Sequence, residues 1–164
     1  MIVVVMGVSG SGKTTIGTAL ARAMHCAFLE GDGLHSAANV EKMSHGIPLT
    51  DADRAPWLAA IHARIAEAVA GGQSLVVACS ALKAAYRTTL SAGVPIAWVY
   101  LKGSPELIRE RMKHRAGHFM KASMLASQFD ALEEPSDAIV ADVAEPPAVL
   151  VQHVLAALRQ HDGV

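Results

Sequence analysis

Short apolar runs alternate along the chain with longer segments in which apolar residues recur every three or four positions. The short runs are rich in aliphatic and β-branched residues, a composition typical of buried strands. Five strands are predicted on this basis, at residues 2–6, 27–29, 74–80, 94–103 and 137–143.

The longer segments predict helices. In residues 54–70, for example, Trp57, Ile61 and Ile65 recur on one helical face. Residues 104–115 open with serine, proline and glutamate, a typical helix start. Helices are predicted at residues 13–25, 54–70, 81–91, 104–115, 121–132 and 146–160, with a loop at 116–120. Strands separated by helices predict an α/β fold with a parallel sheet covered on both faces.

The composition favours one folded domain over residues 1–164. That length lies within the usual range for a single domain. Hydrophobic residues make up 52% and charged residues 18%, which argues against disorder. The net charge of −1 and the 4% aromatic content argue against a nucleic-acid partner, which normally requires a basic face or stacking rings.

The cysteines and the first apolar run indicate the cellular compartment of the protein. Cys26 and Cys79 are far apart in apolar surroundings, which favours reduced thiols over a disulfide framework. The run at 2–6 is far shorter than the ~20 residues that span a bilayer, and no basic leader precedes it. We therefore expect a cytoplasmic protein with no membrane partner.

The segment "GVSGSGKT" at residues 7–14 is the strongest functional signal. Gly7, Gly12, Lys13 and Thr14 fit the pattern G-x-x-x-x-G-K-[ST], and the segment lies between a predicted strand and a predicted helix. In this context backbone N–H groups surround phosphate oxygens, the lysine reaches the β- and γ-phosphates, and the threonine can ligate Mg²⁺. The alternative is a glycine-rich turn that arose by chance.

This loop does not by itself define the nucleotide chemistry. No Asn-Lys-x-Asp segment is present to recognise guanine, and the run at 74–80 ends without the acidic residue that often completes a metal shell. Asp32, after the second predicted strand, is the best remaining carboxylate.

Acidic and basic residues follow the predicted strands, where ligands bind in open parallel sheets. Asp32 and His35 follow the second strand, Lys83 and Arg87 follow the third, and Arg54 lies in a polar loop between them. A carboxylate can orient a hydroxyl for in-line attack, and cations can bind an anionic acceptor. The pattern predicts phosphorylation of a small hydroxylated acid. Each residue also has a structural alternative: Asp32 as a helix cap, His35 as a loop residue, Arg54 paired with an aspartate of its loop, and Lys83 and Arg87 solvated.

The segment "RERMKHRAGHFMK" at 109–121 predicts a lid. Arg111 and Arg115 lie four residues apart on one helical face, where their like charges repel unless a polyanion lies between them. Such a lid, expected at about 111–130, would bring arginines onto the transferred phosphate and exclude water. The alternative is a solvated basic helix face.

Several segments together resemble the gluconokinases, a family of P-loop small-molecule kinases. They are "GVSGSGKTTIG", "LEGDGLH", "NVEKMSHGIPLTDADRAPWL", "CSALKAAYR", "VYLKGS" and "GHFM…LASQFDALEEP", and the match runs from about residue 3 to residue 142. The resemblance implies a nucleoside-monophosphate-kinase-like three-layer fold with five parallel strands and a helical lid. It also implies transfer of the γ-phosphate of ATP to the 6-hydroxyl of D-gluconate, and a homodimer.

The resemblance also implies a role for each candidate residue. Asp32 orients the primary hydroxyl, and Lys13, Arg111 and Arg115 stabilise charge on the transferred group, with Thr14 on Mg²⁺. The residues expected to bind ATP are Gly7, Ser9, Gly10, Ser11, Gly12, Lys13, Thr14 and Thr15. The residues expected to contact gluconate are Asp32, His35, Arg54, Lys83 and Arg87.

One departure from the family pattern concerns the acceptor loop. Ser36 follows His35 where the family commonly has proline, which frees the φ angle of that residue and would loosen the loop. Two other functions stay open at this point: a shikimate-kinase-like enzyme for another hydroxy acid, and a nucleotide-binding regulatory module without catalysis.

Overall fold

A computed structural model describes residues 1–114 and 122–163 and shows a parallel sheet of five strands. The strands are β1 (Ile2–Met6), β2 (Ala27–Glu30), β3 (Leu75–Ala78), β4 (Ala97–Lys102) and β5 (Ile139–Asp142). Their order in the sheet is β2-β3-β1-β4-β5, and every neighbouring pair is parallel. The five strands and the parallel sheet predicted from the apolar runs are confirmed.

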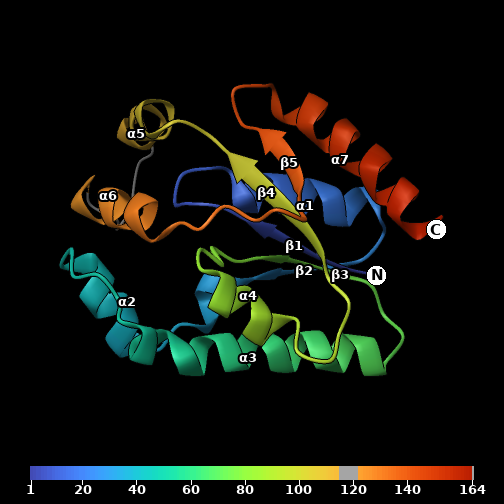
Figure 1. Ribbon diagram of the computed structural model, residues 1–164, viewed down its shortest axis with the longest axis horizontal. Coiled ribbons are helices and arrows are strands. Elements are labelled where there is room, and N and C mark those ends of the chain that lie inside the picture. Colours follow the sequence, from blue (N-terminus) through green and yellow to red (C-terminus); the bar gives the residue numbers. More distant parts are fainter. Residues whose placement is uncertain (115–121, 164) are drawn as a thin grey trace.

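Helices cover both faces of this sheet, which gives three layers (Figure 1). They are α1 (Lys13–Ala23), α2 (Ala37–Ser44), α3 (Asp51–Ala70), α4 (Ala84–Leu90), α5 (Pro105–Lys113), α6 (Ala122–Ala131) and α7 (Pro147–Asp162), with a 3₁₀ helix η1 at Gly31–Leu34. In Figure 1, α3 and α4 lie below the sheet, α1 and α7 lie above it, and α2, α5 and α6 lie beyond the carboxyl ends of the strands.

The alternation of side chains along β1 separates two cores. Val3 and Val5 pack into the cluster that includes side chains of α1 and α7. Val4 packs on the opposite face with Ile61 and Ile65 of α3. All five are fully buried, and each such side chain contributes about 1.5–3 kcal/mol of hydrophobic stabilisation. The two cores hold the sheet rigid beneath the loops at its carboxyl edge.

Two helices begin away from their predicted positions. Helix α3 begins at Asp51 rather than 54, because Thr50 and Asp53 form a capping box in which each side chain accepts a hydrogen bond from the other's backbone N–H. Helix α4 begins at Ala84 rather than 81, since Ala81 has φ 44°, in the left-handed region that a helix cannot contain.

Helix α2 was not predicted from the apolar pattern. Its buried residues are Asn39 and Met43, so no apolar stripe marks the segment. Ser36 caps its N-terminus by accepting a hydrogen bond from the Asn39 backbone N–H at 3.2 Å. Ser36 has φ −64°, the value that proline would impose, so the serine keeps this backbone conformation and adds a cap.

The elements beyond the carboxyl edge contact one another. Met43 of α2, Leu49 before α3 and Met124 of α6 form a small buried cluster. This cluster joins α2 to α6, two elements far apart in the sequence. Across residues 1–114 and 122–163, the structure has no helix with the length and apolar character of a membrane span.

Candidate active site

The glycine loop lies between β1 and α1, as its sequence pattern requires. Gly12 is the N-cap of α1 with φ 100°, a conformation that side chains disfavour, and no side chain caps the helix. The first N–H groups of α1 therefore stay open to an anion. The Ser11 hydroxyl is buried with no hydrogen-bond partner in the described part of the chain, which also fits a loop built around phosphate.

Lys13 lies over this loop. Its ammonium donates hydrogen bonds to the carbonyl oxygens of Gly7, at 3.1 Å, and Val8, at 2.9 Å. The loop is tied to α6 as well, because the Ser9 backbone N–H donates to the Gln128 side-chain oxygen at 2.7 Å. Residues of α6 thus hold the phosphate loop from outside the sheet, a contact that the sequence pattern did not indicate.

Thr14, the residue predicted to ligate Mg²⁺, points toward the end of β2. Its hydroxyl donates a hydrogen bond to the carboxylate of Glu30. A hydroxyl and a carboxylate are hard oxygen ligands of the kind that Mg²⁺ prefers, directly or through water. Sequence reasoning missed Glu30, although its position as the last residue of a strand at the ligand-binding edge was a usable signal.

Asp32 lies on η1, exposed at the same edge of the sheet. The neighbouring Gly31 lets η1 approach β3 closely, since a Cβ there would come within 2.4 Å of the Ala78 carbonyl oxygen. Trp57 fixes the turn from the other side, because its indole N–H donates to the Gly31 carbonyl oxygen at 2.8 Å. Close packing on both sides therefore sets the position of Asp32.

Cys79 lies just beyond β3, at the same edge of the sheet. Burial raises the pKa of the Cys79 thiol to about 12, and the charges of Asp32, Lys13 and Glu30 also act on it. The thiol itself is protonated and buried, as expected for an unreactive cysteine.

His35 lies against α3. Its ring stacks on Trp57 with centroids 4.1 Å apart and planes 13° apart. Three effects act on the pKa of His35. Burial, the largest, lowers this pKa, the charge of Asp32 raises it, and the charge of Arg54 lowers it. The net shift is downward, so the imidazole is neutral at pH 7.

Arg54 and Lys83 are brought together by Tyr86, which was given no role in the sequence-based prediction, and by Asp51, one of the loop aspartates considered there as a partner of Arg54. The Tyr86 hydroxyl donates to Asp51, and Lys83 Nζ lies 3.0 Å from the same carboxylate. Arg54 Nη1 lies 3.3 Å from the Tyr86 hydroxyl, and both cations are 5.6 Å from the Tyr86 ring centroid. The hydroxyl and Lys83 lower the pKa of Asp51, which keeps its carboxylate charged between the cations.

Arg87 is directed at the main chain. Its guanidinium donates to the carbonyl oxygens of Ala81 at 2.8 Å, Leu82 at 3.1 Å and Glu133 at 2.9 Å. These bonds hold the turn that precedes Lys83 and join it to the segment after α6. The predicted contact of Arg87 with substrate stays a prediction.

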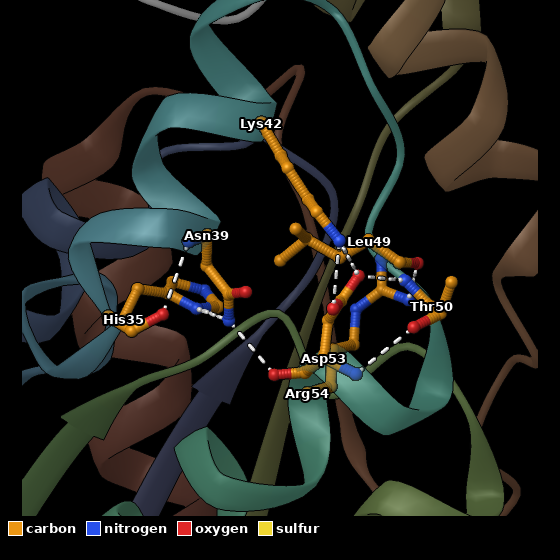
Figure 2. Close-up of polar contacts among 8 residues, drawn as sticks. His35, Asn39, Lys42, Leu49, Thr50, Asp53 and Arg54 are labelled. Atoms are coloured by element: carbon orange, nitrogen blue, oxygen red, sulfur yellow. Dashed lines mark hydrogen bonds and ion pairs between the residues drawn. The ribbon is translucent and has the colours of Figure 1, made fainter.

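Helix α2 is fastened to the start of α3 by an ion pair (Figure 2). Lys42 Nζ lies 3.0 Å from both carboxylate oxygens of Asp53. The Thr50 N–H, followed by Lys42, lowers the pKa of Asp53 from 3.8 to about 2. This pair keeps α2 against the turn that carries Arg54.

A cavity of about 340 Å³ lies on the outer side of the glycine loop. Gly12 and Thr15 line it from the loop and α1, while Arg111, Val143 and Glu145 line it from α5 and from the segment after β5. The Arg111 guanidinium donates to the Val143 carbonyl oxygen. The cavity lies beside the phosphate loop, so it suits the parts of a nucleotide other than its phosphates.

The predicted lid is described in part. Arg111 ends up beside the cavity just described, whereas Arg115 and the rest of residues 115–121 lie outside the described residues. Helix α6, which would form the second half of the lid, packs against α5 and contacts the glycine loop through Gln128.

The edge of the sheet thus combines a phosphate loop, two carboxylates near it and a pair of cations held by Asp51 and Tyr86. The arrangement can bind a nucleoside triphosphate on one side and an anionic hydroxyl compound on the other. Fold and site together define a P-loop kinase of the nucleoside-monophosphate-kinase-like class.

Comparison with known proteins gives the family within this class. A family profile described as an AAA domain matches residues 2–135. The gluconokinase of Gluconobacter oxydans (strain 621H) is 53% identical over 135 residues, which are 82% of this chain and 76% of that protein. The thermoresistant gluconokinase of Escherichia coli (strain K12) is 44% identical over an alignment of 165 positions that covers 97% of this chain and 94% of that protein.

A solved structure agrees with these relatives. The crystal structure of a gluconokinase from Sinorhizobium meliloti 1021 has a TM-score of 0.85 and 49% identity, and the alignment covers 96% of this chain and 91% of that one. The chain belongs to the gluconokinase family. The resemblance inferred from the sequence motifs is confirmed, and with it the kinase fold and an enzymatic role. The roles of individual residues stay predictions.

Proposed function

We propose that this chain transfers the γ-phosphate of ATP to the 6-hydroxyl of D-gluconate, giving 6-phospho-D-gluconate and ADP. The observation that carries the proposal is the cation pair Arg54 and Lys83 at the same sheet edge as the phosphate loop, in a chain of the gluconokinase family. A sugar acid offers a carboxylate for the cations and a primary hydroxyl for phosphorylation.

The nucleotide side of the site is residues 7–15. The N–H groups of the loop and of the start of α1 would hold the β- and γ-phosphates, with Lys13 moving from its carbonyl partners onto the phosphate oxygens. Thr14, with Glu30 beside it, would hold Mg²⁺, which neutralises charge on the phosphates when bound.

The acceptor side is built from η1, α3 and α4. Arg54 and Lys83 bind the carboxylate and neighbouring hydroxyls of the sugar acid, and His35 contacts a further hydroxyl. Arg87 acts on this side by holding the turn that carries Lys83. Asp32 accepts a hydrogen bond from the primary hydroxyl and takes its proton as the oxygen–phosphorus bond forms.

The transition state of phosphoryl transfer is loose, so positioning and charge stabilisation matter more than a strong base. Lys13, Arg111 and Arg115 would supply the positive charge around the transferred group. We propose that residues 111–130 form a lid on a single domain of residues 1–164, and that its closure excludes water from the phosphate.

Three wider features belong to the same proposal. Mg²⁺ is the metal, because Thr14 and Glu30 offer hard oxygen ligands. The protein works as a homodimer, as its resemblance to gluconokinases implies. It is cytoplasmic, in keeping with two free cysteines, Cys26 and Cys79, and with ATP as the phosphate donor.

An acceptor panel tests the function. Purified protein with ATP and Mg²⁺ is offered D-gluconate, L-idonate, shikimate, glycerate or a nucleoside monophosphate, and ADP release is followed against a blank without acceptor. Release with D-gluconate alone supports the proposal. Release with shikimate or another acid would overturn the substrate and keep the kinase. Nucleotide binding with no release on any acceptor would favour a regulatory module.

A further inference from the structure

Asn39 is a buried polar residue at the contact between α2 and α3. Its exposed fraction is 5%, and no role followed for it from the sequence pattern. Its amide nitrogen donates to the main-chain carbonyl oxygen of Asp53 at 2.9 Å, and the same nitrogen lies 3.4 Å from Nδ1 of His35. Figure 2 shows the Asn39 amide between the His35 ring and Asp53.

The Asp53 carbonyl fixes which way this amide points. A carbonyl oxygen can only accept, so the NH₂ end of Asn39 must face it. A flipped amide would bring two oxygen atoms together in a buried place. The NH₂ group therefore also faces His35, with one N–H for the carbonyl and one for the ring.

The orientation of the amide determines the protonation state of the ring. An amide nitrogen has no lone pair to accept a hydrogen bond, so His35 Nδ1 must be the acceptor and carries no proton. Neutral imidazole then bears its proton on Nε2. A protonated ring would place its own Nδ1–H against the N–H of the Asn39 amide, with no acceptor between them.

Two further contacts hold the ring in this setting. His35 stacks on Trp57, which is itself anchored by its hydrogen bond to the Gly31 carbonyl oxygen. The charged groups that act on the ring are Asp32 on η1 and Arg54 on α3. Burial and Arg54 lower the pKa of His35, in agreement with a neutral ring, and Asp32 acts in the opposite direction.

We propose that Asn39 is a positioning residue: it fixes His35 as the neutral Nε2–H tautomer, with the ring held between Asn39 and Trp57. His35 then offers one uncharged hydrogen-bond donor, and only from Nε2. In the proposed function, on which this last step rests, Nε2–H donates to a hydroxyl oxygen of the acceptor. Asn39 contributes to acceptor binding without touching the acceptor.

The tautomer can be measured without substrate. Protein labelled with ¹⁵N-histidine gives imidazole ¹⁵N shifts that distinguish Nε2–H, Nδ1–H and imidazolium, and the His35 signals are assigned by their loss in His35→Gln. The variants are Asn39→Ala, which removes the amide, and Asn39→Asp, whose carboxylate can accept from Nδ1–H. Lys42→Met and Ser36→Ala are the matched controls, because they weaken the docking or the cap of α2 and leave the Asn39 amide in place.

The wild type is expected to show Nε2–H at neutral pH. Asn39→Ala should show a mixture of tautomers, Asn39→Asp should shift the ring to Nδ1–H or imidazolium, and both controls should keep Nε2–H. An Nδ1–H ring in the wild type, or an unchanged ring in Asn39→Ala, would overturn the proposal. So would an equal change in the controls, since that would reduce Asn39 to general support of α2.

Kinetics separate this proposal from the proposed function. In Asn39→Ala the KM for gluconate should rise about 3- to 10-fold, as for one weakened hydrogen bond, with the KM for ATP unchanged. If gluconate is not phosphorylated at all, the proposed function fails and the ¹⁵N spectra still decide the role of Asn39. If the spectra behave as expected and the KM for gluconate does not move, the donor role of His35 is wrong.

Discussion

The hydroxyl of Tyr86 on α4 donates a hydrogen bond to the carboxylate of Asp51 at the start of α3. Burial, followed by the Asp51 hydrogen bond, raises the pKa of Tyr86, so this hydroxyl keeps its proton at neutral pH. The contact connects α3, which carries Arg54, with α4, which begins directly after Lys83. The two cations of the acceptor site thus keep their spacing through a tyrosine and an aspartate.

Replacing Tyr86 by phenylalanine tests this connection. The ring remains beneath both cations, whereas the bonds to Asp51 and Arg54 are lost. We expect the KM for gluconate to rise about 3- to 10-fold, with little change in the KM for ATP, because only the acceptor cations lose their support. Steady-state kinetics in both substrates measure this. An equal rise in both KM values would mean that the variant disturbs the whole sheet edge.

Replacing Asp32 by asparagine tests the role of this carboxylate at the acceptor hydroxyl. The side chain keeps its shape and loses its charge and its capacity to take a proton. We expect turnover to fall by at least about 100-fold. ATP affinity, measured by calorimetry, should stay close to that of the wild type, since the phosphate loop is untouched. Turnover near the wild-type rate would remove Asp32 from the mechanism.

Lys83 and Arg87 are expected to respond differently to removal of their charge. Arg87→Met removes three hydrogen bonds to main-chain carbonyl oxygens, of which, within the described part of the chain, only that of Leu82 keeps another donor, the Glu133 N–H, and should lower the free energy of unfolding by about 2 kcal/mol. Lys83→Met removes an exposed ion pair and should leave stability almost unchanged while raising the KM for gluconate. Urea unfolding and acceptor kinetics on both variants decide between these roles. A stable Arg87→Met protein with weak gluconate binding would instead make Arg87 a direct ligand.

The lowered pKa of Asp53 predicts that the free energy of unfolding depends on pH. Its pKa is about 2 in the folded protein, whereas the usual pKa of an aspartate is 3.8. Ionised Asp53 therefore stabilises the fold fully above about pH 4, and this contribution is lost as the pH falls toward 2. The difference in urea midpoint between the wild type and Asp53→Asn should be largest near neutral pH and shrink below about pH 4. A difference that stays constant down to about pH 2.5 would show that the charge of Asp53 is not the source.

The sequence pattern was informative where one physical signal dominates. Buried strands are continuous apolar runs. The bounds of β1 were predicted correctly and those of β3 to within two residues, whereas β4 begins three residues later than predicted. Helix α2 escaped detection because its buried face is Asn39 and Met43 rather than an apolar stripe. The start of α3 was placed late although Thr50 and Asp53 carry the spacing of a capping box.

The candidate site was predictable in its types of residue and less so in its contacts. A charged residue after a strand can be found by position, which is how Asp32 and Lys83 were found. Whether a cation faces substrate or main chain depends on the backbone conformation of the turn beside it. Arg87 binds the turn at Ala81, whose left-handed conformation has no signal in the sequence. Asn39 and Tyr86 act through other side chains, and such roles appear only when the elements are brought together.

The most direct test of the account is the identity of the phosphorylated product. The reaction with ATP, Mg²⁺ and D-gluconate is followed by proton-coupled ³¹P NMR. We predict a phosphate ester signal split into a triplet by the two protons of a primary carbon, as ADP accumulates in equal amount. A doublet would place the phosphate on a secondary hydroxyl and contradict the orientation proposed here. Inorganic phosphate without an ester would contradict transfer to gluconate altogether.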